Sequence, residues 1–361
     1  MTRRRWLWIA AGLVTVAGAA VTTWLVTRGA PPPTSGRRAG ASFAAGIITL
    51  TANVPTAPMP CARLELASQQ SERQFTVGSG AATRTFRVTG AELVAEASRA
   101  GGRELVVAVI ADAAGAHADT VARLSALRAE LERSRVELVL LLGGMASAAD
   151  ELRALIEPLA TEAPWAVWVV PGDREAPAVV ASTTGPLGTN VVDGARVRFA
   201  TIDNVVIGTL PGAPYASRLE AGVHGCVYTR DDADEVAHAL STREGTRVLV
   251  THAPPRQRGA GASDRVPGGI HIGELDLAAA LEAAPVHLVL HAGVSSTAPG
   301  GTGETRARAT VHLGTTPLDA LPSPGSETGA LIVRIVAGAG ATEPLIRWRR
   351  LRFEGPKLRA R

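Results

Sequence analysis

The stretch "WAVWVVPGDREAP" (Trp165–Pro177) joins an apolar run to a charged turn. The run stops at a Pro-Gly pair, and Asp173, Arg174 and Glu175 follow directly. An uninterrupted apolar run of this kind is typical of a strand that is covered on both faces. Charged residues just after such a strand are either ordinary turn residues or part of a ligand site at the strand end. The choice depends on what the other strands carry at their ends.

Apolar runs alternate with helix-like segments on both sides of this stretch. The runs "ELVVAVIAD" and "VELVLLLGG" precede it, and "NVVIGTL", "RVLVTHAPP" and "VHLVLHAGV" come after it. After the first run, apolar residues recur at helical spacing at Val121, Leu124, Leu127 and Leu131. Alternating strands and helices predict an α/β fold with a substantial parallel sheet. Ligand sites in such sheets lie beyond the carboxyl ends of the strands.

Five strand ends therefore matter most for function: "IADAAG", "LLGGMAS", "VPGDRE", "VTHAPP" and "LHAGVSS". In this order they resemble the calcineurin-like metallophosphoesterase family. The pattern of that family is Asp-x-His, Gly-Asp, Gly-Asn-His-Asp/Glu, His and Gly-His-x-His at successive strand ends. The resemblance covers about residues 104 to 355. It implies a metallophosphoesterase-like four-layer α/β/β/α sandwich.

The resemblance also implies a site in which two divalent metals, bridged by a carboxylate, hold a phosphate ester and generate a hydroxide nucleophile. Asp112 matches the first ligand of the family, Asp173 stands at the position of its Asn ligand, and His252 matches its lone histidine. These three residues are the candidate residual metal ligands. Together they could hold one Mn, Fe or Zn ion.

Other positions of the family pattern are lost. Four ligand positions carry no ligand here, including that of the bridging Asp: Ala114, Gly144, Gly293 and Ser295. Arg174 replaces the catalytic histidine and could bind a phosphate or carboxylate, and Glu175 keeps the acid that comes next in the motif. His117 and His291 are interpreted as incidental rather than compensating. We expect no cofactor, with a single divalent metal as the alternative.

The N-terminal region predicts a membrane segment. "WLWIAAGLVTVAGAAVTTWLV" (Trp6–Val26) carries no charge and follows Arg3, Arg4 and Arg5. A spanning helix needs about 20 apolar residues, and basic residues stay on the cytoplasmic side. Residues 1–27 are therefore expected to be a single-pass anchor, with the bulk of the chain extracytoplasmic, on the periplasmic side. A cleaved signal peptide ending near "AGA" (17–19) is the rival interpretation.

The rest of the chain divides into three regions. Residues 28–43 read as a Pro/Gly/Arg linker, 44–102 as a small β-rich module or a β extension of the next domain, and 103–361 as the metallophosphoesterase-like domain. Cys61 and Cys226 show no metal-binding spacing. In an exported chain they can pair in a disulfide, and two unpaired thiols are the alternative.

The composition of the chain limits the classes of partner that it is expected to bind. The 361-residue chain has a formal net charge of +4, and much of the excess lies near its two ends. Aromatic residues make up only 4% and are not interleaved with basic ones, so no nucleic-acid surface is expected. Three functions remain: a pseudoenzyme that acts as a binding or scaffolding module, a residual one-metal phosphoesterase, and an envelope structural spacer.

Overall fold

The computed structural model describes most of the region after residue 58. The described residues are 59–61, 72–78, 83–95, 104–215, 218–219, 225–259, 261–266, 269–292, 304–307, 309–319, 328–338, 343–355 and 357–360. The expected anchor, the linker, Gly293 and Ser295 lie outside them. Among the helices within these ranges, none is long and apolar enough to cross a membrane.

A seven-stranded mixed sheet contains the stretch that opens the sequence analysis. Its strands lie in the order β18 (Lys357–Ala360), β17 (Leu345–Glu354), β16 (Thr328–Val336), β5 (Glu104–Ile110), β6 (Leu138–Leu142), β7 (Ala166–Val170) and β8 (Val191–Asp193). The four strands β5 to β8 run parallel, whereas β16, β17 and β18 add on antiparallel. Strands β6 and β7 are buried along their whole length, as their continuous apolar runs predict.

A nine-stranded mixed sheet faces the first one. Its order is β14 (Glu304–Ala307), β15 (Thr310–Gly314), β13 (Leu288–His291), β12 (Thr246–Thr251), β10 (Val205–Leu210), β9 (Phe199–Ile202), β4 (Glu92–Ala95), β3 (Arg84–Thr89) and β2 (Arg73–Val77). Its central strands β10, β12, β13 and β15 are parallel. The described part of the β-rich region, β2 to β4, thus extends this sheet, because β4 pairs in parallel with β9.

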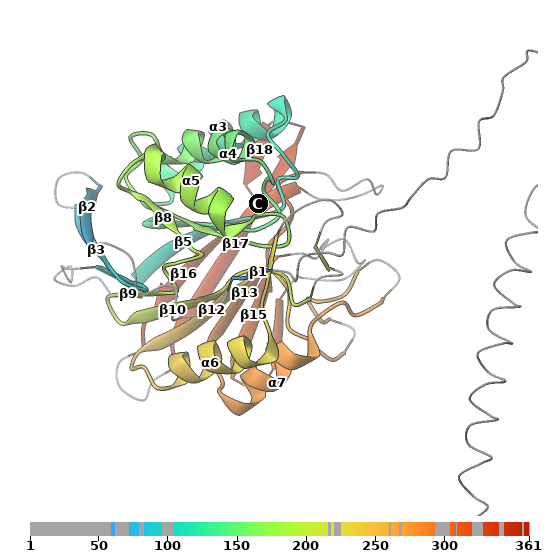
Figure 1. The fold of residues 1–361 in the computed structure, drawn as a ribbon. Helices are drawn as coiled ribbons and strands as arrows, with labels where there is room; N and C mark the ends of the chain where they lie inside the picture. Colours follow the sequence, from blue (N-terminus) through green and yellow to red (C-terminus); the bar gives the residue numbers. More distant parts are fainter. Residues whose placement is uncertain are drawn as a thin grey trace, which may run out of the picture. The chain divides into compact units, whose positions relative to one another are not determined.

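Helices cover the outer faces of both sheets (Figure 1). They are α3 (Ala118–Arg133), α4 (Ala149–Ala160), α5 (Pro177–Leu187), α6 (Arg230–Ser241) and α7 (Leu275–Ala283). One apolar cluster lies between the sheets, a second under α3 and α4, and a third under α6 and α7. Alternate residues of β5 enter the first and second clusters, because successive side chains of a strand point to opposite faces.

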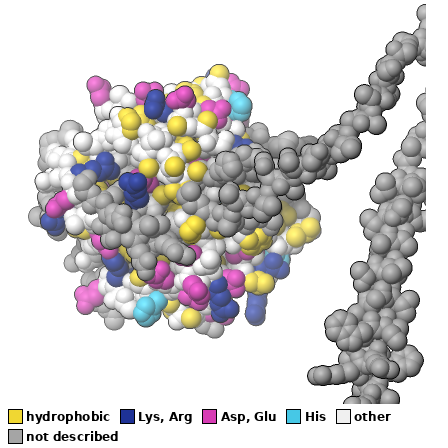
Figure 2. All heavy atoms as spheres, in the orientation of Figure 1, with side chains coloured by type: hydrophobic (Ala, Val, Ile, Leu, Met, Phe, Trp, Pro, Cys, Tyr) yellow, Lys and Arg dark blue, Asp and Glu magenta, His cyan; other side chains and the backbone are white. Residues whose placement is uncertain are grey.

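The layers are therefore helix, sheet, sheet and helix, the arrangement expected from the resemblance to metallophosphoesterases. On the face shown in Figure 2, basic and acidic side chains are interspersed over both helix layers.

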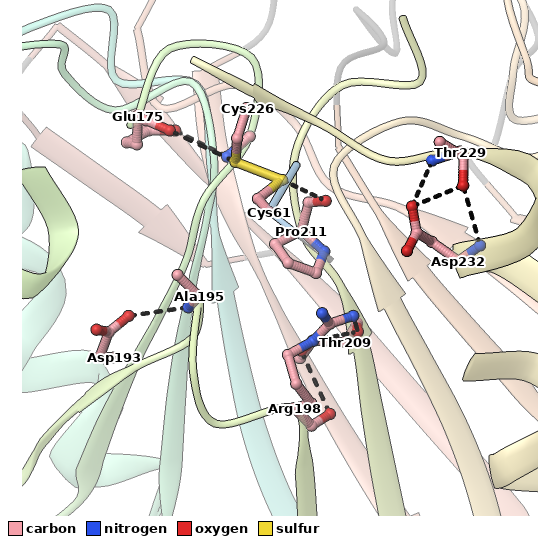
Figure 3. The surroundings of a disulfide bond; sticks show 11 residues. Cys61, Glu175, Asp193, Ala195, Arg198, Thr209, Pro211, Cys226, Thr229 and Asp232 are labelled. Carbon is pink, nitrogen blue, oxygen red and sulfur yellow. Dashed lines mark hydrogen bonds between the residues drawn. A yellow bond between two sulfur atoms is a disulfide. The ribbon is translucent and has the colours of Figure 1, made fainter. Parts of the chain in front are cut away.

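The two cysteines form a disulfide bond. It joins Cys61, which directly follows the short strand β1 (Met59–Pro60), to Cys226 in the parallel partner strand β11 (Cys226–Val227). The two Cα atoms lie 5.2 Å apart, within the range usual for disulfides. Figure 3 shows the bond beside Glu175, whose carbonyl oxygen is 3.9 Å from the Cys226 sulfur. Of the two alternatives for the cysteines, the structure supports pairing.

Candidate functional site

The strand ends of both sheets meet at one place. Asp112 lies just after β5, Gly144 after β6 and Asp173 after β7, all in the seven-stranded sheet. His252 comes directly after β12 in the nine-stranded sheet. Because these strands are parallel within each sheet, their carboxyl ends share an edge. The three candidate ligands predicted from the sequence are thereby brought together.

Asp112, His252 and Asp173 form a contiguous acid–imidazole–acid cluster. His252 Nε2 lies 3.0 Å from Asp112 Oδ1 and 3.8 Å from Asp173 Oδ1. The side chain of His252 is 7% exposed and that of Asp173 is 34% exposed. Both carboxylates therefore approach the same ring nitrogen, and Asp173 is the more exposed of the two.

The carboxylates control the charge of the imidazole. Burial by itself lowers the pKa of His252, but the hydrogen bond to Asp112 and the charges of Asp173, Asp112 and Glu175 outweigh it. The result is a pKa of about 9. At neutral pH the ring is therefore protonated, and Nε2–H donates its hydrogen bond to Asp112.

Glycines allow the strand-end turns to pack tightly around this cluster. A Cβ placed on Gly143 or Gly172 would lie 2.6 Å or 2.8 Å from the nearest His252 ring atom. A Cβ on Gly144 would collide with Asp112 Oδ1, and Gly144 has a φ of +65°. This left-handed conformation disfavours a side chain at Gly144, and the close contact requires Asp112 or the turn to shift before one fits. At the position that carries the bridging carboxylate in the family, the space for a side chain is therefore occupied by Asp112.

Glu175 fixes the turns rather than facing solvent. It is 1% exposed, and its carboxylate accepts hydrogen bonds from the backbone N–H groups of Met145 (2.5 Å), Ala146 (3.1 Å) and Gly172 (2.8 Å). Burial raises its pKa, and the bonds from Gly172 and Met145 oppose that rise. Through these hydrogen bonds Glu175 connects the turn after β6 with the turn after β7. A role for Glu175 in catalysis stays a prediction.

The other residues singled out from the sequence lie around the cluster. Arg174 is half-buried next to Asp173, and its role in binding an anion stays a prediction. Ala114 has a φ of +54° and donates its N–H to Gly144 O. His117 is exposed at the N-terminus of α3.

His291 is fully buried and shares a 2.9 Å hydrogen bond between its Nε2 and Ser263 Oγ. Burial, His312, Arg350 and His252 lower the pKa of His291 to about 3, against the small rise from Ala292. This imidazole is therefore neutral at physiological pH and held by a serine.

The described residues do not fit the two-metal centre of the family. Asp112 and His252 bond directly to each other, and Gly144 supplies no bridging carboxylate, with Asp112 in the space where its side chain would lie. Within the ranges described above, no group of three or more His, Cys, Asp or Glu side chains is arranged to hold a metal ion.

A cleft opens beside the cluster. A cavity of about 120 Å³ is lined by Asp173 and His252 and adjoins a larger one of about 400 Å³. The two cavities share Pro214, Arg218, Ile272 and Glu274. Their walls come from the loops after β10 and β12, again at carboxyl ends of parallel strands. Ligand sites typically have volumes of about 300–1,000 Å³, so the larger cavity is of that size.

Sequence reasoning missed the residues of this cleft. Tyr215 and Tyr228 both line the larger cavity, and they are the only two tyrosines in the chain. Aromatic residues make up only 4% of the chain, so two tyrosines 13 positions apart in irregular segments could have indicated a binding site. Arg218 and Glu274 gave no such signal, because their types are common and they belong to no motif.

Comparisons with known proteins concern the fold. No family model matches the chain, and no curated protein matches it in sequence. Among solved structures, TT1561 of Thermus thermophilus is 15% identical, with a TM-score of 0.43, over 63% of this chain and 93% of that one. GAP50, the anchor in the inner membrane complex of Plasmodium, is 11% identical, with a TM-score of 0.43, over 71% and 88%.

A dimetal phosphatase from Danio rerio is 11% identical, with a TM-score of 0.47, over 67% of this chain and 98% of that one. The described strands of this chain form a two-sheet α/β fold, and most of the metal-ligand motifs of the metallophosphoesterase pattern are missing from its sequence.

Proposed function

We propose that this chain is a degenerate metallophosphoesterase-like protein that has lost two-metal hydrolysis and acts as a binding or scaffolding module. The observation that carries the proposal is the turn at Gly144. It lies where the family has its bridging carboxylate, it adopts a left-handed conformation, and Asp112 occupies the space that a side chain would need. In this proposal Arg174 is a candidate ligand for a phosphate or carboxylate.

In this proposal, the loss of the bridging carboxylate explains the loss of phosphate-ester hydrolysis. Two adjacent metals clamp the attacking and leaving oxygens of a phosphate ester, and the uncatalysed hydrolysis of such esters is extremely slow. Asp112 Oδ1 and Asp173 Oδ1 lie 3.0 Å and 3.8 Å from the same nitrogen of His252, so the protonated imidazole offsets one of the two negative charges without a metal. A binding role requires only the cleft beside that cluster.

The direct test uses the full-length chain purified in mild detergent. We expect substoichiometric Mn, Fe and Zn by elemental analysis. We also expect no hydrolysis of p-nitrophenyl phosphate or bis-p-nitrophenyl phosphate above background when each metal is added. A metal-dependent rate that disappears in both His252→Ala and Asp173→Ala would overturn the proposal. It would show that the three residual ligands form a working one-metal site.

Gly144→Asp is the informative variant of this test, and Gly185→Asp is its control. We expect Gly144→Asp to gain no activity and to lower the midpoint of denaturant unfolding, because its side chain meets Asp112. A Cβ on Gly185 has no heavy atom within 4 Å, so Gly185→Asp tests the cost of a new carboxylate without a clash. Metal-dependent activity in Gly144→Asp would mean that the turn reopens into a metal site.

We also propose that residues 1–27 anchor the chain with its C-terminal domain on the extracytoplasmic side. The uncharged run Trp6–Val26 behind three arginines supports this orientation. The disulfide agrees with it, since such bonds persist in oxidising compartments. Alkaline phosphatase fused after Arg361 should be active, and a cytoplasmic reporter at the same place should not. Mature protein that starts near Ala20 would instead demonstrate cleavage.

A further inference from the structure

The cleft beside Asp173 contains polar atoms without partners at both of its ends. Tyr228 lines the larger cavity and is 3% exposed, and no group among the described residues bonds to its buried hydroxyl. At the other end, Asp173 Oδ1 is buried and lies 3.8 Å from His252 Nε2, but it has no hydrogen bond within the described part of the chain. A buried polar atom without a partner is unfavourable, so a ligand that satisfies either atom gains affinity.

The two ends prefer opposite kinds of ligand group. Asp173 offers a carboxylate oxygen and therefore accepts from an ammonium or another donor. The far end is lined by the guanidinium groups of Arg230 and Arg256. Arg230 is 62% exposed and lies 3.5 Å from Asp234 and 4.0 Å from Asp276, whereas no carboxylate among the described residues lies within 4.0 Å of Arg256. Arg256 therefore favours an anionic ligand group at the far end.

The middle of the cleft carries donors and acceptors together. Arg218 donates to Tyr215 Oη (3.1 Å) and to Ile272 O (3.1 Å), and its guanidinium lies 3.5 Å from Glu274. Each guanidinium has five N–H donors, and Arg218 uses two of them within the described residues. A main chain with alternating N–H and C=O groups matches such a wall.

The rim of the cleft is apolar. Four large hydrophobic side chains are exposed among the described residues, and three of them lie here: Tyr215 (44%), Ile270 (65%) and Leu275 (70%). Tyr215 and Leu275 line the larger cavity, and Ile270 is adjacent in sequence to its wall at His271. Exposed apolar groups that gather around a polar cleft mark an interaction surface, and Tyr and Arg are enriched where partners bind tightly.

We propose that this cleft binds a short peptide through both of its charged ends, with the ammonium at Asp173 and the carboxylate at Arg256. The main chain of the peptide then bonds to Tyr228, Arg218 and Glu274, and its side chains pack on the rim. The inference deepens the proposed binding role and rests on it.

Calorimetric titration of the full-length chain with tri-L-alanine tests the inference. N-acetyl, C-amide and doubly blocked forms of the same peptide remove one charge or both. We expect the zwitterion to bind most tightly and each block to weaken binding about tenfold, as for the loss of a hydrogen bond to a charged group. Equal binding of the doubly blocked form would overturn the assignment of the two ends.

Tyr228→Phe gives the sharpest variant. Because its hydroxyl has no partner in the described chain, we expect an unchanged or higher unfolding midpoint together with about tenfold weaker binding of tri-L-alanine. Arg256→Gln and Asp173→Asn should weaken binding of the free carboxylate and of the free amine, respectively. Arg153→Gln, in the exposed face of α4, is the matched control and should change neither property.

The failures of the two proposals are distinguishable. A chain that is inactive with every metal and does not bind tri-L-alanine at millimolar concentration overturns the peptide inference alone. Binding of inorganic phosphate in its place, lost in Arg256→Gln, identifies the cleft as an anion site and also overturns it. Metal-dependent hydrolysis overturns the proposed function. A clear loss of stability in Tyr228→Phe shows that the hydroxyl has an internal partner, which removes the main support for the inference.

Discussion

Replacing Cys61 and Cys226 together by serine should lower the free energy of unfolding by about 5 kcal/mol. The bond closes a loop between residues 165 positions apart. In the chain-entropy model, a cross-link over so long a loop removes many conformations from the unfolded chain, and the stabilisation grows slowly with loop length. The measurement is denaturant unfolding of the oxidised wild type beside the double variant.

The reduced wild-type chain is the matched control, because it has the same sequence as the oxidised chain and lacks only the bond. Its unfolding midpoint should coincide with that of the double serine variant and lie well below that of the oxidised protein. Labelling of two thiols in the denatured, unreduced wild type, or identical midpoints for all three samples, would show that the bond does not form in the protein.

Arg84→Ala should cost about 3–5 kcal/mol, the range for breaking a buried ion pair by removing one partner. Arg84 is 3% exposed and lies 2.9 Å from Glu137 and 3.0 Å from Asp203. Glu137 precedes β6 in one sheet, and Asp203 lies between β9 and β10 in the other. The variant leaves both carboxylates in a poorly hydrated place without this cation, so the native state loses far more than one surface contact.

Arg87→Ala is the control for this prediction. Arg87 lies on the same strand and is 48% exposed, with Glu72 3.8 Å away. Exposed ion pairs contribute little, so the change should stay within about 0.5 kcal/mol. Urea unfolding of both variants gives the comparison. If Arg84→Ala is as stable as Arg87→Ala, the buried charges are hydrated or compensated in a way that the structure does not contain.

The strands with continuous apolar runs were predictable because burial on both faces leaves a strong pattern. β6 and β7 are examples: each is buried throughout, and each was expected from sequence alone. Helix α5 was not expected. Its residues "PAVVASTTGPL" include β-branched residues, a glycine and an internal proline, which are weak helix formers. Its helical state depends on packing against the sheet, which local sequence does not encode.

Some residues of the candidate site could also be predicted from the sequence, and others could not. Asp112, Asp173 and His252 could be predicted, since each comes directly after a strand and matches a family position. The conformation of Gly144 could not, because a glycine in a sequence does not reveal the sign of its φ. The pairing of β4 with β9 and the cleft around Tyr228 also depend on loops whose course only the fold determines.

The central place of β16 in the seven-stranded sheet has a consequence for biosynthesis. β16 pairs with β5, so that Ile332 lies opposite Ala108. A ribosome adds about 5–20 residues per second, so β5 waits for its neighbour until nearly the whole chain has been made. During that interval β5 has an open edge with apolar residues on both of its faces, and the sheet cannot close. Such a delay makes a chain that stops before residue 328 prone to aggregation.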